Sequence, residues 1–476
     1  MTERTLRGRV PVLASGAMFL AMLDATVMSL AVSDLHADLP RYEVATLTWA
    51  ITLYAVCFAA LLAPAGRLAD LVGRRVLFQA GVGLFTLASL GCAVAPDLPV
   101  LLVTRGVLGA AAAAMIPASL ALLLHDTPPE RRASAIGLWS AAGSLAAALG
   151  PVVGGLLVGA FGWRSLFVIN LPVGVAMVAA GVRLPRGVTR RGPLPDVLGT
   201  ASLGLGVGGF ALGVTRIQDG GWQDPGTPGL LGGGLLLVAW ALWRSFRHPV
   251  PAVETSLWRS RGFAVANLAS ALYGAALFPW LLVCVLFLTE RWRYSVAEAG
   301  MASTPGALTA TAAALVIGRL IGRTGARVAV VGGALTMAAA GTWVVAGISD
   351  EPRFLTYWLP IALVMGTGMG AVTTGTSTAA ALSVEPARFA GATGLNTTAR
   401  QLGGAVGVAV VAAVLPAGAV TGDFATVFGL IVAASLGAAV AGLWLAVPPR
   451  RPQPTTGAGP VEVTDTARRR GAGAGT

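Results

Sequence analysis

The chain is built largely of apolar runs of about 20 residues that recur along almost its whole length, with short polar connections between them. A helix of about 20 residues is about 30 Å long, which matches the hydrocarbon core of a bilayer. Of the 476 residues, 55% are hydrophobic and 11% are charged, whereas soluble domains carry roughly 25% charged residues. The pattern therefore predicts an all-α polytopic membrane protein.

The runs predict fourteen membrane-spanning helices, an even number that places both termini on one side of the membrane. All 33 basic residues are arginines, and most lie in the connections on one side of these spans. Arginine in short loops marks the cytoplasmic side, so we expect an inner (cytoplasmic) membrane protein with both termini in the cytoplasm. The expected spans are residues 10–33, 45–65, 76–96, 99–124, 135–160, 165–184, 196–216, 228–246, 261–289, 297–320, 327–348, 355–383, 392–417 and 423–447.

Several classes of protein are excluded by composition and motifs. The net charge of +12 does not indicate nucleic-acid binding, because the arginines follow the predicted topology. Cys57, Cys92 and Cys284 lie inside apolar runs and the three histidines lie in predicted loops, so no disulfide, metal site or catalytic group is indicated. The chain has no lysine and so no phosphate-binding G-x-x-x-x-G-K motif. We predict neither an enzyme nor a cofactor, and an ion gradient remains as the energy source.

One charged connection recurs. The sequence G-R-L-A-D-L-V-G-R-R from Gly66 to Arg75 has a fainter copy, G-R-L-I-G-R-T-G-A-R, from Gly318 to Arg327. The offset is 318 − 66 = 252 residues, so the chain consists of two related halves. With Asp70 in place, the first copy resembles the loop signature of the major facilitator superfamily of secondary transporters.

That resemblance implies two six-helix bundles related by an axis along the membrane normal. Two further helices between the bundles make the chain similar to the fourteen-helix drug:proton antiporter branch. We expect a first bundle at residues 1–184 and two inserted helices with flanking cytoplasmic linkers at 185–260. The second bundle is expected at 261–447 and a disordered cytoplasmic tail at 448–476.

The first charged loop has two interpretations. It either marks topology alone, or it is a conformational latch that pairs across the two halves while the cytoplasmic side is closed. Topology requires arginine but neither an aspartate nor the glycine spacing, so we favour a latch. In the second copy Gly322 replaces Asp70, and that loop is expected to be topological. The candidate latch residues are Gly66, Asp70, Gly73, Arg74 and Arg75.

Asp24 is the most informative single residue. It follows Arg9 by about 15 residues, which is about 22 Å along a helix and near the middle of the bilayer. A carboxylate there costs about 2.5–3.5 kcal/mol, so it should face a cavity or a partner. The stretch from Leu23 to Val32 resembles the first-helix motif of the fourteen-helix branch. We favour a proton-coupling role, with a fixed ion pair or polar contact between helices as the alternative.

Arg105 is the second charge inside a predicted span. It needs a counter-ion, and Asp24 is the one acidic residue that we place well inside a span. The stretch from Thr104 to Gly109 resembles the family's fourth-helix motif. The resemblance implies that Arg105 takes part in proton coupling. The alternative is an arginine that extends to the outer interface.

The fifth predicted span contains G-P-V-V-G-G. Pro151 removes a backbone hydrogen bond and bends the helix, while Gly150, Gly154 and Gly155 permit close approach of a neighbour. This resembles the motif characteristic of antiporters in the superfamily, and tight packing without bearing on transport is the alternative. The stretch from Trp163 to Gly174 resembles the sixth span of the fourteen-helix branch.

Candidate cavity residues come from both halves. Asn396, Arg400 and Gln401, in a stretch that resembles the thirteenth span of the branch, either line a cavity or hold the cytoplasmic gate shut. Tyr54 and Phe58, with Tyr273, Phe278 and Trp280 in the second half, either contact lipophilic substrates or pack the core.

Together these features favour a proton-coupled antiporter that exports drugs or antibiotics by alternating access. Its expected partners are a small lipophilic substrate, neutral or monocationic, with protons and membrane lipids; we expect no nucleic acid, and a monomer. The alternatives are an exporter of one endogenous metabolite, a non-transporting membrane sensor or scaffold, and an importer that uses the same residues.

Overall fold

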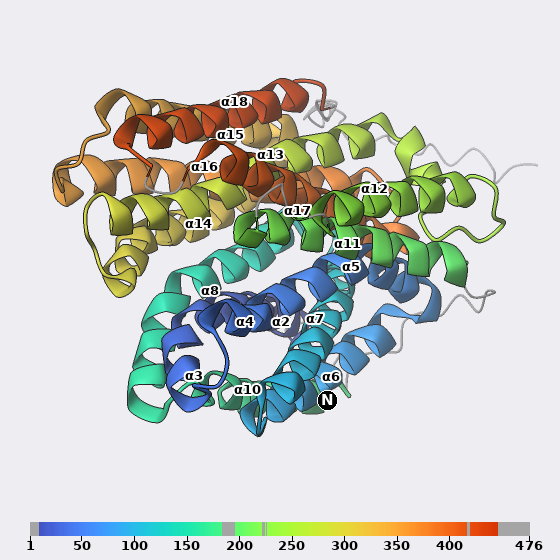
Figure 1. The fold of residues 1–476 in the computed structure, drawn as a ribbon. Helices are drawn as coiled ribbons and strands as arrows, with labels where there is room; N and C mark the ends of the chain where they lie inside the picture. The colour runs from blue at the N-terminus through green and yellow to red at the C-terminus, as the bar shows by residue number, and fades with distance from the viewer. Residues whose placement is uncertain (1–8, 183–195, 221–223, 225, 417–418, 446–476) are drawn as a thin grey trace, which may run out of the picture. The chain divides into compact units, whose positions relative to one another are not determined.

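The computed structural model describes residues 9–182, 196–220, 224, 226–416 and 419–445, and every regular element among them is helical (Figure 1). The predicted tail at 448–476 and most of the linker before residue 196 lie outside the described residues. The longer helices are α2 (Arg9–Val27), α5 (Trp49–Val72), α6 (Arg74–Ala93), α7 (Leu98–Asp126), α8 (Arg132–Phe161), α10 (Asn170–Gly181), α11 (Val197–Gly220), α12 (Gly226–Ser245), α13 (Arg261–Glu290), α14 (Val296–Thr324), α15 (Ala326–Gly347), α16 (Leu359–Leu382), α17 (Phe389–Val414) and α18 (Thr421–Gly442). The short ones are α3 (Val32–Asp38), α4 (Val44–Leu47) and α9 (Ser165–Val168), with the 3₁₀ turns η1 (Met28–Ala31), η2 (Pro129–Arg131), η3 (Thr255–Arg259) and η5 (Pro386–Arg388) and a π-helical turn, η4 (Phe354–Trp358).

Thirteen helices in the described part of the chain are long and apolar enough to cross a membrane. A shorter apolar segment, Ser165–Gly181, stands where the sixth span is predicted, and it is divided into α9 and α10 at Ile169. Large apolar side chains such as Leu156 (70% exposed) and Leu236 (72% exposed) point out of the packed helices, as contact with lipid requires. The prediction of an all-α, multi-pass membrane protein is confirmed.

The first predicted span is interrupted one turn after Asp24, where α2 gives way to η1 at Met28. Helix α2 ends at Val27 and continues as η1, so the helix is shorter than the predicted 10–33. The hydroxyl of Thr26 donates to the carbonyls of Met22 and Leu23, at 3.1 and 2.9 Å, and such bonds compete with the regular helical pattern. The polar end of the first span is therefore held next to Asp24.

Helices α2 to α10 pack around α7, which is the most deeply buried span (Figure 1, blue to teal). Its alanines at 111, 112 and 113 are fully buried, and their small side chains let α2, α5 and α6 approach closely.

Helices α13 to α18 form the second group, in which aromatic rings supply much of the core. Trp280, Phe287, Trp358 and Phe428 stack or meet edge to face with centroids 5.6–6.3 Å apart. Trp280, a candidate cavity residue, is 6% exposed inside this cluster, so core packing describes it better.

The two groups meet along α5–α17 and along α8–α14, and the 252-residue repeat relates these contacts. Gly66 of α5 lies against Gly394 of α17, and Gly318 of α14 lies against Gly137 of α8. Each α5–α6 and α14–α15 connection is a single glycine with positive φ, Gly73 at 112° and Gly325 at 84°, a conformation that other residues rarely adopt. The four domain boundaries remain a prediction.

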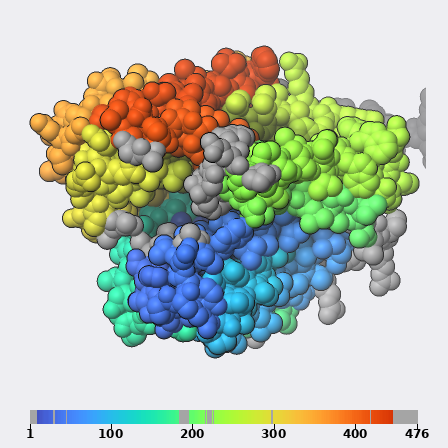
Figure 2. All heavy atoms as spheres, in the orientation of Figure 1, coloured from blue at the N-terminus to red at the C-terminus, as the bar shows by residue number. Residues whose placement is uncertain are grey.

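The inserted helices α11 and α12 pack on each other through glycines, with Gly206 and Gly213 of α11 facing Gly234 and Leu231 of α12. Helix α11 also contacts α5 and α17, one from each group. In Figure 2 the green atoms of the insertion lie beside both the blue and the red parts of the chain. The insertion therefore touches both halves.

Substitution of Gly318 by valine should destabilise the α8–α14 contact, because an added Cβ would lie 2.7 Å from the Cα of Gly137. Overpacking of this kind costs about 1–3 kcal/mol. The thermal unfolding temperature of the purified protein should therefore fall. Gly322→Val is the matched control, since Gly322 lies on the same helix with nothing within 4 Å. Equal effects of both substitutions would contradict the prediction.

Candidate functional site

Asp24 of α2 and Arg105 of α7 form an ion pair inside the first group of helices. Arg105 Nη1 donates to Asp24 Oδ2 at 2.6 Å, and the side chains are 0% and 1% exposed. One of the two predictions for Arg105 was that it extends to the outer membrane interface. The structure instead buries its guanidinium against Asp24. In a region of low dielectric constant each charge depends on the other for compensation.

A second group of polar contacts holds the carboxylate. The amide of Asn170, at the start of α10, donates to Asp24 Oδ1 at 3.3 Å and to the hydroxyl of Ser89 at 3.2 Å. Asn170 and Ser89 are buried, so these bonds do not compete with water. Both carboxylate oxygens are thus engaged, one by a cation and one by a neutral donor.

The guanidinium is enclosed by rings and by one carbonyl. Arg105 Nε donates to the carbonyl of Ala50 at 2.7 Å, and the carbon Cζ lies 4.5 Å from the ring centre of Tyr54 and 5.7 Å from that of Phe167. The hydroxyl of Tyr54 donates to the carbonyl of Ala21 at 3.0 Å. Tyr54, predicted as a cavity residue, therefore packs on the cation. The ring of Phe58 stacks on that of Tyr54, with their centroids 6.1 Å apart.

A change of charge at Asp24 also changes the surroundings of Arg105. A proton on Asp24 would remove its charge and leave Arg105 compensated by Ala50 and the aromatic faces alone. Such a cluster can link the protonation of one carboxyl group to the packing of α2, α7 and α10. Asn170 was not among the predicted site residues, although it lies in the stretch from Trp163 to Gly174 that the sequence singled out.

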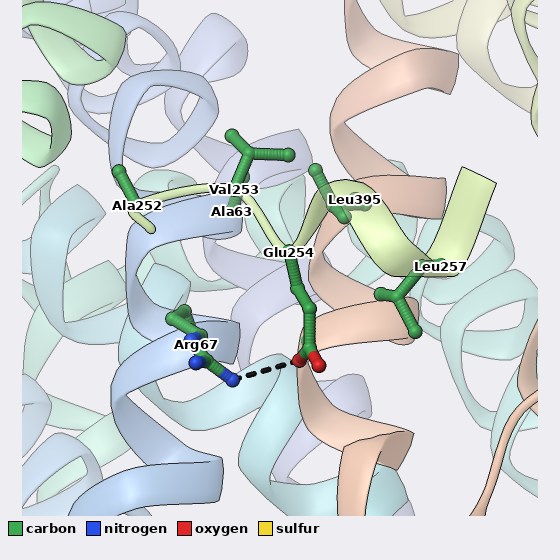
Figure 3. A pocket seen from close by; sticks show the side chains of 8 residues that line it. Ala63, Arg67, Ala252, Val253, Glu254, Leu257 and Leu395 are labelled. Atoms are coloured by element: carbon green, nitrogen blue, oxygen red, sulfur yellow. Dashed lines mark hydrogen bonds and ion pairs between the residues drawn. The ribbon is translucent and has the colours of Figure 1, made fainter. Parts of the chain in front are cut away.

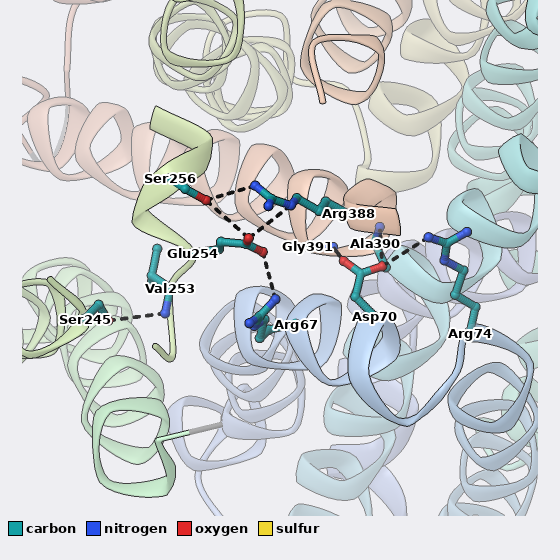
Figure 4. Close-up of polar contacts among 10 residues, drawn as sticks. All are labelled: Arg67, Asp70, Arg74, Ser245, Val253, Glu254, Ser256, Arg388, Ala390 and Gly391. Atoms are coloured by element: carbon teal, nitrogen blue, oxygen red, sulfur yellow. Dashed lines mark hydrogen bonds and ion pairs between the residues drawn. The ribbon is translucent and has the colours of Figure 1, made fainter. Parts of the chain in front are cut away.

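The charged loop forms a second polar site, where α5 meets the start of α17 (Figure 4). Asp70 Oδ2 accepts from the backbone N–H of Gly391 at 2.7 Å and Asp70 Oδ1 from that of Ala390 at 3.3 Å. These are free N–H groups of the first turn of α17, where the helix dipole favours an anion. Arg74 lies 3.5 Å from Asp70 and donates to the carbonyl of Pro386.

The other predicted latch residues have different surroundings. Gly66 lies so close to Ala390 that an added Cβ would be 2.5 Å from its carbonyl oxygen. Arg75 donates to the carbonyl of Val182 at 2.6 Å, within the first group. Asp70, Arg74 and Gly66 thus contact the second half, while Arg75 does not do so through this bond.

Glu254, in the segment between α12 and α13, pairs with Arg67 of α5 (Figure 3) and joins both halves near Asp70 (Figure 4). Its carboxylate lies 2.8 Å from Arg67 Nη1 of α5 and 3.1 Å from Arg388 Nε of η5. The hydroxyl of Ser256 donates to the same carboxylate at 3.2 Å and accepts from Arg388 at 2.9 Å. A small pocket here is lined by α5, α17 and this segment. Glu254 was not predicted, although it is the one acid among the arginines from Arg244 to Arg261.

The glycine–proline motif of α8 faces two neighbours. Gly150 is buried against Thr26 of α2, and Pro151 lies against Gly300 of α14, 3.2 Å from the position of an added Cβ. Gly154 is buried and Gly155 is exposed with nothing within 4 Å. The motif therefore joins α2, the helix that carries Asp24, to the second half.

In the second half, the predicted cavity residues lie along α17. The amide of Asn396 donates to Ser270 Oγ of α13 at 2.8 Å. Arg400 is 8% exposed, and Gln401 is half-buried. The stretch thus belongs to the interior where α13 and α17 meet.

Ion pairs also lie at the opposite ends of the spans. Arg164 donates to Asp38 at 2.6 Å, and this bond together with that from Trp163 lowers the pKa of Asp38. Arg291 binds Asp350 through two nitrogens at 2.8 Å, which with a bond from Thr421 lowers the pKa of Asp350 to about 2. These exposed pairs join connections between spans.

Comparison with known proteins decides the family. The family model described as "Major Facilitator Superfamily" matches residues 14–407 and 262–471. The chain belongs to the major facilitator superfamily. This superfamily protein is therefore a membrane transporter of small substrates and not an enzyme.

Two curated members of the superfamily are similar over most of their length. The chain is 31% identical to the multidrug resistance protein Stp of Mycobacterium tuberculosis over 402 residues, covering 84% of this chain and 74% of Stp. It is 32% identical to the cephamycin export protein CmcT of Amycolatopsis lactamdurans over 417 residues, covering 86% of this chain and 85% of CmcT.

A solved member has the same fold. The crystal structure of the human organic anion transporter MFSD10 superposes with a TM-score of 0.67, covering 91% of this chain and 99% of that chain at 17% identity. The superposition supports the major facilitator fold and carries no argument about substrate.

Replacement of Asp24 by leucine should lower the free energy of unfolding by about 3–5 kcal/mol, because Arg105 would be left buried without a counter-ion. The double variant Asp24→Leu/Arg105→Met removes both charges, and it should be closer to wild type than the single variant. Denaturant unfolding in detergent micelles measures both. Strictly additive losses would contradict the interdependence of the two charges.

Proposed function

We propose that this transporter is a proton-coupled antiporter that exports drugs or antibiotics across the cytoplasmic membrane by alternating access. The observation that carries the proposal is the Asp24–Arg105 pair, since an ionisable carboxyl group inside a span marks an ion or proton pathway by default. The names of two relatives, a multidrug resistance protein and a cephamycin export protein, support drug export and its direction.

In the proposed cycle Asp24 binds a proton from outside and releases it inside, with substrate leaving in exchange. Arg105 and Asn170 are the two groups that donate to this carboxylate. Protonation weakens the contact between α2 and α7, and Gly150 and Pro151 connect α2 through α8 to the second half. A change of charge at Asp24 thereby alters how the two halves pack.

The charged loop is the latch in this proposal. We assign the face that carries Asp70 and Glu254 to the cytoplasm, together with both termini, because the arginines concentrate there. The bonds from Gly391 and Ala390 to Asp70, with those of Glu254 to Arg67 and Arg388, stabilise the form closed on that face. Substrate entry from the cytoplasm requires these bonds to break.

An exporter of one compound is the second candidate, and the name of CmcT, which specifies a single antibiotic class, favours it. Both candidates use Asp24 in the same way and differ only in the breadth of the substrate site. A scaffold without transport activity would tolerate loss of Asp24, which the next experiment measures.

Asp24→Asn should abolish substrate efflux from proteoliposomes under an imposed pH gradient, because asparagine cannot exchange a proton. The panel contains lipophilic cations, neutral antibiotics and lipophilic carboxylates. Asp126→Asn, the same change outside the buried cluster, is the matched control and should transport like wild type. A folded Asp24→Asn protein that exports as fast as wild type would contradict the proton-coupling proposal.

Asp70→Asn and Glu254→Gln should each open the latch more often. We expect a cysteine at position 395, in the pocket between the halves, to react about tenfold faster with a water-soluble maleimide, since a charged hydrogen bond contributes about 1.5–3 kcal/mol. Cys57, Cys92 and Cys284 are replaced by alanine beforehand. Glu351→Gln, an exposed glutamate outside the latch, is the control, and unchanged labelling in both latch variants would refute the assignment.

A further inference from the structure

Arg400 differs from every other buried charge in the described part of the chain. Four charged side chains are buried there: Asp24, Arg105, Asp196 and Arg400. Asp24 pairs with Arg105 and Asp196 with Arg244, whereas no hydrogen bond or ion pair among the described residues engages the guanidinium of Arg400. A buried cation without an anion is strongly unfavourable. An anion bound here would supply the compensation that the described chain does not.

The surroundings of Arg400 suit a ligand site. It lies in α17 one turn after Asn396, and its backbone packs against Gly274 of α13. The hydroxyl of the neighbouring Tyr273 lies 2.7 Å from that of Thr373 in α16. Asn396 is fixed by its bond to Ser270. Helix α17 also packs against α5 and α7 of the first half, so Arg400 lies on a helix of the second half that contacts the first.

We propose that Arg400 binds the acidic group of the transported substrate, and that the substrates of this protein are lipophilic carboxylates or other singly charged organic anions. The substrate class rests on the proposed export function, whereas anion binding itself does not. A guanidinium donates two parallel hydrogen bonds to a carboxylate, which gives both charge compensation and orientation. Tyr273 and Asn396 flank it with polar groups on apolar helices.

The proposal replaces the neutral or monocationic substrates expected from the sequence. A cationic compound would add a second positive charge beside Arg400, which the low-dielectric interior disfavours. An anion instead neutralises the site. Its binding should therefore stabilise the folded protein, in proportion to its concentration relative to its Kd.

The test is ligand binding by the full chain in lipid nanodiscs at pH 7, followed as an upward shift of the thermal unfolding temperature. The probes are decanoate, 1-naphthylacetate and diphenylacetate, each paired with its neutral primary amide. Wild type should bind at least one acid about tenfold or more tightly than its amide, as a charge-assisted bidentate pair implies. Arg400→Gln should lose this preference. Arg323→Gln, an exposed arginine on α14, is the matched control and should keep it.

Arg400→Lys provides a second criterion if the glutamine variant does not fold. Lysine keeps the charge but not the planar pair of donors, so the preference for acid over amide should fall several-fold. Equal binding of every acid and amide by wild type, or a preference that persists in Arg400→Gln or is unchanged in Arg400→Lys, would overturn the proposal. The measurement needs neither transport nor a pH gradient, so binding of acids by the wild-type protein is read out independently of the efflux assay on Asp24→Asn. Failure of proton coupling is thereby distinguished from failure of anion binding.

Discussion

A carboxylate and a guanidinium lie 2.6 Å apart in the apolar interior of the first group of helices, where a charge without a partner would be strongly unfavourable. The contacts around the pair reach four helices: Ala50 and Tyr54 of α5 hold the cation, and Asn170 of α10 holds the carboxylate. Since Asp24 and Arg105 come from α2 and α7, the charge state of one side chain bears on the packing of the whole group. That dependence supports the proposed role of Asp24 in proton coupling.

The two contacts between the halves differ although the 252-residue repeat relates them. At α8–α14 the helices meet through Gly137 and Gly318, without the aspartate. At α5–α17 the corresponding glycines are accompanied by Asp70, whose carboxylate binds the first turn of α17. Glu254 adds a second acid from the segment that follows the inserted helices. Charged contacts such as those of Asp70 can break when the transporter changes conformation, whereas the glycines at α8–α14 only allow close packing. The proposed opening of the cytoplasmic side therefore occurs at α5–α17. The inserted helices are tied to that event through Glu254.

The sequence predicted the helices far better than the contacts between their side chains. Spans, the paired loops and the position of Asp24 follow from hydropathy and spacing, which are local properties. The sixth span is shorter than expected, and it is divided into α9 and α10 at Ile169. Asn170 and Glu254 were missed, since an asparagine at a helix start and a glutamate in a basic linker carry no periodic signal. For Tyr54 and Trp280 the sequence left cavity contact and core packing open, because aromatic residues inside spans can serve either role and only their neighbours distinguish the two.

By itself the sequence determined that the chain crosses the membrane as helices in two related halves, because a bilayer admits few structures and apolar length reports them directly. It also located the charges that burial would make significant. Only the tertiary structure decided which charges are compensated. Asp24 pairs with Arg105, Asp70 with the start of α17 and Glu254 with two arginines from different halves, whereas the guanidinium of Arg400 has no ion pair or hydrogen bond in the described chain. Compensation depends on distances between residues that are up to 321 positions apart, and no local pattern encodes those distances.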